Sequence, residues 1–172
     1  VYGISENATK MYDDARKTFA GFINANDNQI IFTKSTTEGI NQIANSIERT
    51  YDLKDKDNII VTEIEHHSNF VPWQQLCKRK HIEFRAVPYN LKKNNIDNIA
   101  NYVDAQTRIV AFTAMSNVSG LFIDVKDEIK NIRKKNKNSI IVIDATQYVA
   151  HKKLNVKDWD ADFIVFSAHK VY

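Results

Sequence analysis

The chain of 172 residues contains few of the residues that cross-link or interrupt a fold: one cysteine, two prolines and four glycines. A single cysteine, Cys77, excludes an internal disulfide framework and is consistent with a reducing compartment. No apolar run approaches the roughly 18 residues of a membrane span, and residues 1–10 lack the charged start and apolar core of a secretory signal. With 43% hydrophobic residues, we expect a single domain over residues 1–172.

Two nucleotide-binding signatures are also missing. Neither G-x-G-x-x-G nor G-x-x-x-x-G-K-[ST] follows any predicted strand, which argues against a nucleotide-binding α/β domain. The net charge of +3 and the 26% of charged residues are ordinary, so they indicate neither a nucleic-acid partner nor an acidic membrane surface. The densest basic stretch, residues 130–137, falls where a predicted helix ends, and cations there favour the helix dipole and face water.

Segments typical of strands and of helices alternate along the chain. Short β-branched or aromatic runs predict strands at Gln29–Thr33, Asn58–Thr62, Glu83–Val87, Arg108–Thr113, Ile140–Asp144 and Asp162–Ser167. Apolar spacings of three and four predict helices at Met11–Phe22, Ile40–Ile47, Pro72–Lys80, Ile96–Val103 and Val125–Lys135. The two prolines, Pro72 and Pro88, fall near predicted boundaries. We therefore predict a mostly parallel, doubly wound α/β sheet with helices on both faces, in which ligands bind beyond the carboxyl ends of the strands.

Polar residues follow several of these predicted strand ends. Residues 33–41 read TKSTTEGIN and lead into a helix, where hydroxyls and free backbone N–H groups suit a phosphate. An ordinary N-cap box explains the same residues equally well. Residues 116–120 read SNVSG, and Asn with Gly at such a place is most typical of a turn.

Two adjacent histidines, His66 and His67, follow the strand that ends at Thr62. They resemble metal ligands, but adjacent side chains diverge, and no Cys or His follows at a spacing that completes a zinc site. We therefore expect no metal centre. A histidine ring presented in a loop can instead stack on a planar ligand, and an unremarkable surface histidine is the simpler alternative.

The most informative pair is Asp144, which ends one buried strand, and Lys170, which lies just past the next. A cofactor with a pyridine ring, an aldehyde and a phosphate needs both residues: the amine forms a Schiff base, and the carboxylate keeps the ring nitrogen protonated. Either residue alone is explained by a surface lysine or a capping aspartate. Their combination with a phosphate site favours pyridoxal 5'-phosphate (PLP).

With these residues, the sequence resembles the class V, fold-type I PLP enzymes, and among them the cysteine desulfurases of the sulfur-mobilising SUF branch, including selenocysteine lyase-like enzymes. The resemblance runs over essentially the whole chain. Its most specific stretches are TTEGIN at residues 36–41, EHH at 65–67 with Asn69, VPW at 71–73, SNV at 116–118, Asp144 with Gln147, and Ser167 with His169 and Lys170.

The resemblance implies a role for each matching residue. Lys170 would be the catalytic lysine that carries the cofactor, Asp144 would pair with the pyridine nitrogen, and His67 would stack on the ring and take part in catalysis. The remaining contacts would come from Asn117 and Gln147 at the phenolic oxygen, and from Thr37, Ser167 and His169, with Thr36 nearby, at the phosphate.

The resemblance also implies an activity: conversion of L-cysteine to L-alanine with transfer of sulfur, as an enzyme persulfide, to a partner in iron–sulfur cluster assembly. Selenocysteine lyase, transaminase and kynureninase-like hydrolase activities are the alternatives. A homodimer is implied, with no nucleic-acid or membrane partner, and we expect a cytoplasmic location, or an organelle if a transit segment has been removed.

The family's nucleophilic cysteine and its substrate-carboxylate arginines lie in a later part of the chain, on and near a smaller C-terminal domain. We therefore expect residues 1–172 to be a partial large domain that binds PLP poorly and does not turn over substrate. Cys77 lies at helical spacing with Trp73 and Leu76, which predicts an inert, partly buried thiol rather than that nucleophile.

Overall fold

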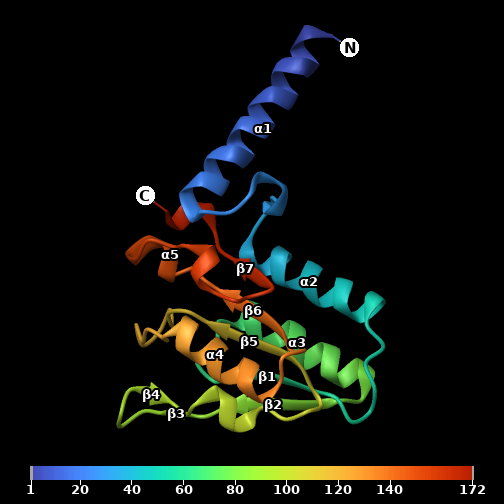
Figure 1. The fold of residues 1–172 in the computed structure, drawn as a ribbon, viewed down its shortest axis with the longest axis vertical. Coiled ribbons are helices and arrows are strands. Elements are labelled where there is room, and N and C mark those ends of the chain that lie inside the picture. Colours follow the sequence, from blue (N-terminus) through green and yellow to red (C-terminus); the bar gives the residue numbers. More distant parts are fainter. Residues whose placement is uncertain (1, 172) are drawn as a thin grey trace.

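The computed structural model describes residues 2–171 and has alternating helices and strands (Figure 1). The α-helices are α1 (Gly3–Ile23), α2 (Thr36–Thr50), α3 (His67–Lys80), α4 (Val125–Lys135) and α5 (Tyr148–His151). The strands are β1 (Asn58–Thr62), β2 (Glu83–Val87), β3 (Tyr89–Asn90), β4 (Asn95–Ile96), β5 (Thr107–Thr113), β6 (Ile140–Asp144) and β7 (Phe163–Val165). Short 3-10 turns are η1 (Asp27–Gln29), η2 (Ile99–Tyr102), η3 (Val156–Asp158) and η4 (Ala168–Lys170).

Five strands form one parallel sheet in the order β2-β1-β5-β6-β7. The strands β3 and β4 form a separate antiparallel hairpin. Residues of β1 and β6 are buried along their whole length, as expected for parallel strands covered on both faces. The predicted α/β class and parallel sheet are therefore confirmed, and the carboxyl ends of β1, β5, β6 and β7 meet along one edge.

Alternate residues of each strand supply two hydrophobic layers, one on each face of the sheet. On one face, α2 and α3 pack through Ile40, Ala44, Ile47, Trp73 and Leu76 against Ile59, Ile109 and Val142. On the other face, α4 packs through Val125, Ile129 and Ile132 against Ile60, Val110, Phe112 and Ile143. The predicted helices at Ile40–Ile47 and Val125–Lys135 are confirmed, and the helices cover both faces of the sheet.

Helix α1 leads away from the sheet, and its last turn lies nearest to the rest of the chain (Figure 1). Only Ala20 and Ile23 are buried within it, whereas Met11 is 73% exposed. The helix ends at Asn24, which takes the left-handed conformation (φ 57°) and caps it by donating its backbone N–H to the carbonyls of Ala20 and Gly21. The helix predicted at Met11–Phe22 is confirmed. Within residues 2–171, no helix is both long enough and apolar enough to cross a membrane.

The strand predicted at Gln29–Thr33 is wrong. Residues Asp27–Gln29 form the turn η1, and the four residues that follow pair with no described strand. The carbonyl of Ile30 instead accepts a hydrogen bond from Arg16 Nη1 (3.1 Å), and Ile31 is 78% exposed. The β-branched and aromatic composition favours an extended backbone, but a strand also needs a neighbour, which the sequence pattern does not reveal.

The helix predicted at Ile96–Val103 is also wrong. Ile96 belongs to strand β4, and only Ile99–Tyr102 is helical, as the 3-10 turn η2. Asn98 begins this turn, with its side chain accepting the Ala100 N–H (2.9 Å). One turn is enough to bury Ile99 and Ala100, so their helical spacing reflects a short turn and not a full helix.

Two boundaries also differ from those predicted. Helix α3 starts at His67, five residues before the predicted start, so Pro72 lies inside the helix and not at its boundary. The strand predicted at Asp162–Ser167 is shorter in the structure, where β7 covers only Phe163–Val165. The longer α3 places His66 at its N-cap and His67 in its first turn.

The packing of α4 makes a testable prediction. Ile132 is fully buried against the sheet, so Ile132→Ala in the full-length protein leaves a cavity and should lower the free energy of unfolding by about 2–5 kcal/mol. Lys130→Ala, at an exposed position of the same helix, is the matched control. Urea unfolding measures both; equal stability losses would contradict the packing described here.

Candidate functional site

A cluster of hydroxyl groups ties the start of α2 to the ends of β6 and β7. The Oγ1 of buried Thr36 lies 2.7 Å from Ser167 Oγ and 2.9 Å from Thr146 Oγ1. Ser35, not Thr36, caps the helix, accepting the Glu38 N–H at 3.1 Å. The N-cap explanation therefore holds for Ser35, whereas Thr36 adds a hydroxyl to a group of donors at a helix N-terminus, a place that favours anions.

Asp144 ends β6 and is only 4% exposed. Its Oδ1 accepts the Thr146 N–H at 2.9 Å. Burial raises the pKa of Asp144, while hydrogen bonds from Thr146 and the charges of His66 and Lys170 oppose the rise. The structure therefore places a buried carboxylate within electrostatic reach of the predicted lysine and of one histidine.

Lys170 lies in the turn η4, directly after the last strand of the sheet. Its backbone N–H donates to the Ser167 carbonyl (3.2 Å), so the lysine and the hydroxyl cluster share one short turn. Lys170 is half-buried, whereas His169 on the same turn is exposed. Gln147 lies on the neighbouring connection, half-buried at the start of α5.

The two histidines occupy the start of α3. His66 caps the helix, with its Nδ1 accepting the Ser68 N–H (3.1 Å). His67 is exposed, and the two ring centroids are 6.3 Å apart with a tilt of 60°. Both line a groove of about 500 Å³ between α2 and α3, together with Thr37. The structure thus brings Thr37 and His67, two predicted site residues, to one groove.

Asn117 is the predicted residue that the structure connects least to the others. It is exposed in a turn organised by Ser116, whose Oγ accepts the backbone N–H groups of Val118 and Ser119, both at 3.3 Å. Gly120 completes the turn with φ 67°, a conformation that glycine adopts readily. The turn interpretation of residues 116–120 is confirmed, and the role of Asn117 stays a prediction.

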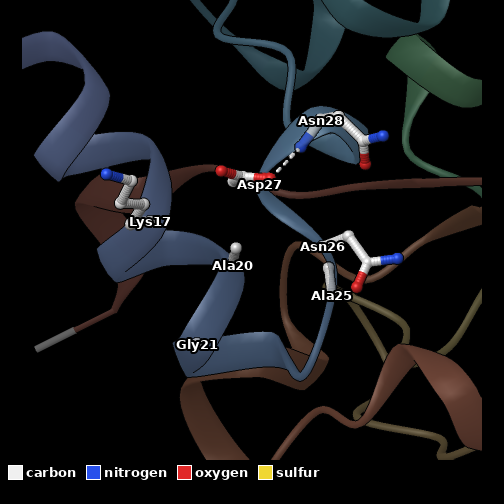
Figure 2. A pocket seen from close by; sticks show the side chains of 7 residues that line it. All are labelled: Lys17, Ala20, Gly21, Ala25, Asn26, Asp27 and Asn28. Carbon is white, nitrogen blue, oxygen red and sulfur yellow. Dashed lines mark hydrogen bonds between the residues drawn. The ribbon is translucent and has the colours of Figure 1, made fainter.

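A second hollow lies between the end of α1 and the turn η1, away from these residues (Figure 2). It has a volume of about 480 Å³, and its lining includes Lys17, Asp27 and Asn28. The dashed line in Figure 2 is the Asn28 N–H donating to Asp27 Oδ1 at 2.9 Å. This hollow contains none of the predicted site residues and is separate from the candidate site at the carboxyl edge of the sheet.

Cys77 is buried on the sheet side of α3, and its Sγ lies 3.5 Å from the Glu83 carbonyl. Burial raises the pKa of the thiol to about 12. The predicted burial of Cys77 is therefore confirmed, and its inert character stays a prediction that the raised pKa supports.

Glu65 was overlooked as a separate candidate in the sequence, although it lies beside the histidines. Its Oε1 accepts hydrogen bonds from the Thr113 N–H (2.9 Å) and from the Thr62 hydroxyl, and its Oε2 accepts one from Asn69 Nδ2 (2.6 Å). Burial is the largest effect on its pKa, which is raised to about 8, and Asp144 adds to the rise while the hydrogen bonds oppose it. The sequence signal that could have identified Glu65 is a carboxylate soon after a buried strand, followed four residues later by the amide of Asn69.

The raised pKa of Glu65 predicts how stability changes with pH. The folded protein keeps this proton over a range where the unfolded carboxyl, with its ordinary value near 4.5, has lost it. The protonated Glu65 carboxyl therefore makes its full contribution to the free energy of unfolding below about pH 4.5. This contribution declines as the pH rises toward 8, by at most about 1.4 kcal/mol per pH unit.

Glu65→Gln should flatten this slope between pH 5 and 8, as measured by denaturant unfolding of the full-length protein at several pH values. Glu63→Gln is the matched control, because Glu63 is exposed at the same turn. Identical slopes in the wild type and in Glu65→Gln would show that Glu65 titrates normally.

Known proteins resemble this chain in sequence and in fold. Cysteine desulfurases of Wigglesworthia glossinidia brevipalpis and Pectobacterium carotovorum are 42% and 38% identical to this chain over its whole length. The apo structure of cysteine desulfurase from Thermococcus onnurineus NA1 superimposes with a TM-score of 0.89 at 33% identity, over 99% of this chain and 42% of that one. The chain likewise spans 42% of the length of each of the two bacterial relatives.

A family profile gives the assignment directly. The profile described as aminotransferase class-V matches residues 1–172, and the fold built on the parallel sheet is that of the desulfurase structure named above. On sequence and fold together, this chain belongs to the class-V aminotransferase family.

Proposed function

We propose that the protein containing this chain is a PLP-dependent cysteine desulfurase that converts L-cysteine to L-alanine and transfers the sulfur to an enzyme thiol. One observation carries the proposal: Asp144, Lys170 and the hydroxyl cluster of Thr36 and Ser167 meet at one edge of the sheet. The relatives described as cysteine desulfurases, which match the whole chain, support the choice of reaction.

The residues present fit PLP in charge and in hydrogen-bonding capacity. The hydroxyls of Thr36 and Ser167 at the start of α2 suit a phosphate. Asp144 is a buried carboxylate without an ion pair to any Lys or Arg in residues 2–171, so it can pair with a cationic ring nitrogen. When bound, PLP supplies an aldehyde that condenses with amines and a ring that accepts electrons.

The same proposal assigns the other predicted contacts. His67 would face the ring, and Gln147 and Asn117 would contact its oxygen substituent. Thr37 and His169 would add phosphate contacts. The position of Thr37 and His67 on one groove supports this assignment.

Lys170 would hold and move protons at the reacting carbon. Its amine is half-buried and close enough to Asp144 for their charges to interact. With PLP and substrate bound, the Lys170 amine would take up and return a proton at the substrate α-carbon. Lys170 is therefore the proposed catalytic base and acid.

The sulfur step balances without an external oxidant or reductant. The C–S bond of cysteine breaks and the carbon gains hydrogen to give alanine, while an enzyme thiol gains the sulfur as a persulfide. Cys77 cannot be that thiol, because it is buried and its pKa is raised to about 12. We therefore assign the accepting thiol to the part of the protein outside this chain.

The proposal also concerns the whole protein, of which this chain would form a part. Residues 1–172 would be part of the PLP-binding large domain of a SUF-branch enzyme that acts as a homodimer in the cytoplasm. Its sulfur would pass to an acceptor protein in iron–sulfur cluster assembly. The bacterial source of the relatives supports this setting.

The proposal is tested by reducing the full-length protein with borohydride in the presence of PLP and mapping the labelled peptide. We expect a single PLP adduct on Lys170. Lys170→Ala should remove the adduct and lower the rate of alanine release from L-cysteine by about 100-fold or more, as expected for loss of the catalytic amine.

Lys153→Ala, at an exposed position, is the matched control and should keep both the adduct and the activity. An adduct on another lysine, or none, would overturn the PLP assignment. An adduct on Lys170 without alanine release would overturn the desulfurase reaction while keeping the cofactor.

A further inference from the structure

Thr146 follows β6 and contacts two separate parts of the proposed site. Its backbone N–H donates to Asp144 Oδ1 at 2.9 Å. Its side-chain Oγ1 lies 2.9 Å from Thr36 Oγ1, which in turn lies 2.7 Å from Ser167 Oγ. One residue therefore joins the buried carboxylate at the end of β6 to the hydroxyl cluster at the start of α2.

The backbone of Thr146 orients the carboxylate of Asp144. An aspartate that accepts the N–H two residues later forms an Asx-turn, which fixes the direction of its side chain. The residue between them, Ala145, is fully buried and donates its N–H to the Val165 carbonyl at 2.8 Å, so the turn is tied to β7. A carboxylate has two oxygens, so Asp144 held in this turn can also accept from a protonated ring nitrogen.

The hydroxyl of Thr146 bonds to a distant element and not to its own turn. Threonine hydroxyls commonly bond to nearby backbone, and those of Thr18 and Thr50 donate to the carbonyl four residues earlier. The Thr146 hydroxyl instead meets Thr36 on α2, 110 positions away. The N-cap of α5 is Gln147, so an ordinary cap does not explain the contact.

The number of hydroxyl hydrogens shows what this contact can do for a phosphate. Thr36 is buried, has one hydroxyl hydrogen, and lies between two hydroxyl partners, so it can donate to only one group at a time. Phosphate oxygens are strong acceptors, so Thr36 beside a phosphate would donate its hydrogen to it. The Thr146 hydroxyl is then placed to donate to the Thr36 oxygen.

We propose that Thr146 is a positioning residue for PLP, whose N–H orients Asp144 and whose hydroxyl supports Thr36 at the phosphate. This role rests on the proposed function, in which Asp144 pairs with the ring nitrogen and Thr36 lies at the phosphate. The aromatic ring of PLP keeps these two parts of the cofactor a fixed distance apart. A residue that bonds to both protein contacts sets the spacing between them.

Binding of PLP and of pyridoxal, which lacks the phosphate, tests the hydroxyl in full-length Thr146→Val. Valine keeps the branched shape and the backbone N–H, so only the hydroxyl is lost. We expect PLP to bind about tenfold more weakly than to the wild type, because a buried hydroxyl of the phosphate site loses its donor. Pyridoxal should bind as it does to the wild type. Absorbance titration of the apo-protein measures both affinities.

Three further variants separate a lost hydrogen bond from general damage. Thr146→Ser keeps the hydroxyl and should restore wild-type affinity for PLP. Thr146→Ala should show the same phosphate-dependent loss as valine, and it serves where the valine variant does not fold. Thr50→Val is the matched control, because it removes an exposed hydroxyl of α2 and should leave both affinities unchanged.

A double-mutant cycle tests whether Thr146 acts through Thr36. In a Thr36→Val background the hydroxyl that Thr146 supports is already absent. Adding Thr146→Val should then cause no further loss of PLP affinity. Losses that multiply in the double variant would mean that the two hydroxyls act independently.

The outcomes separate this inference from the proposed function. With a PLP adduct on Lys170, four results would each overturn the inference alone: unchanged PLP affinity in Thr146→Val, equal losses for PLP and pyridoxal, no recovery in Thr146→Ser, or multiplying losses in the cycle. Absence of the Lys170 adduct in the wild type would overturn the proposed function, and the role of Thr146 would fall with it.

Discussion

The parallel pairing of β5 with β6 is the constraint on which the site depends. It sets Thr113 beside Asp144, and it brings the end of β7 to the other side of Asp144 through the pairing with Val165. The residues that follow these strands can then meet only at the carboxyl edge. The hydroxyl cluster adds the start of α2 to the same edge, since Thr36 reaches Ser167 across 131 positions of the sequence.

Burial changes the pKa values of the carboxyl groups at this edge of the sheet. Apolar residues cover both faces of the sheet, and the polar groups at its end are removed from water by the same packing. Removal from water is the largest effect on the pKa values of Asp144 and Glu65 and raises both, while the hydrogen bonds that each carboxyl accepts oppose the rise.

The sequence predicts those features that depend on local patterns. The alternation of strand and helix segments predicted a parallel sheet with helices on both faces, and polar residues after strands predicted the edge at which Asp144 and Lys170 lie. Features that depend on distant partners were missed. The segment 29–33 has strand composition but pairs with no described strand, and Glu65 accepts a hydrogen bond from the Thr113 N–H, 48 positions away.

The central claim is that the carboxyl edge of this sheet is the PLP site, and a crystal structure of the full-length protein with PLP tests it most directly. We expect continuous density from Lys170 Nζ to the cofactor, the ring nitrogen within hydrogen-bond distance of Asp144, and the phosphate against Thr36 and Ser167. Cofactor density elsewhere, such as in the hollow beside η1 (Figure 2), would contradict it.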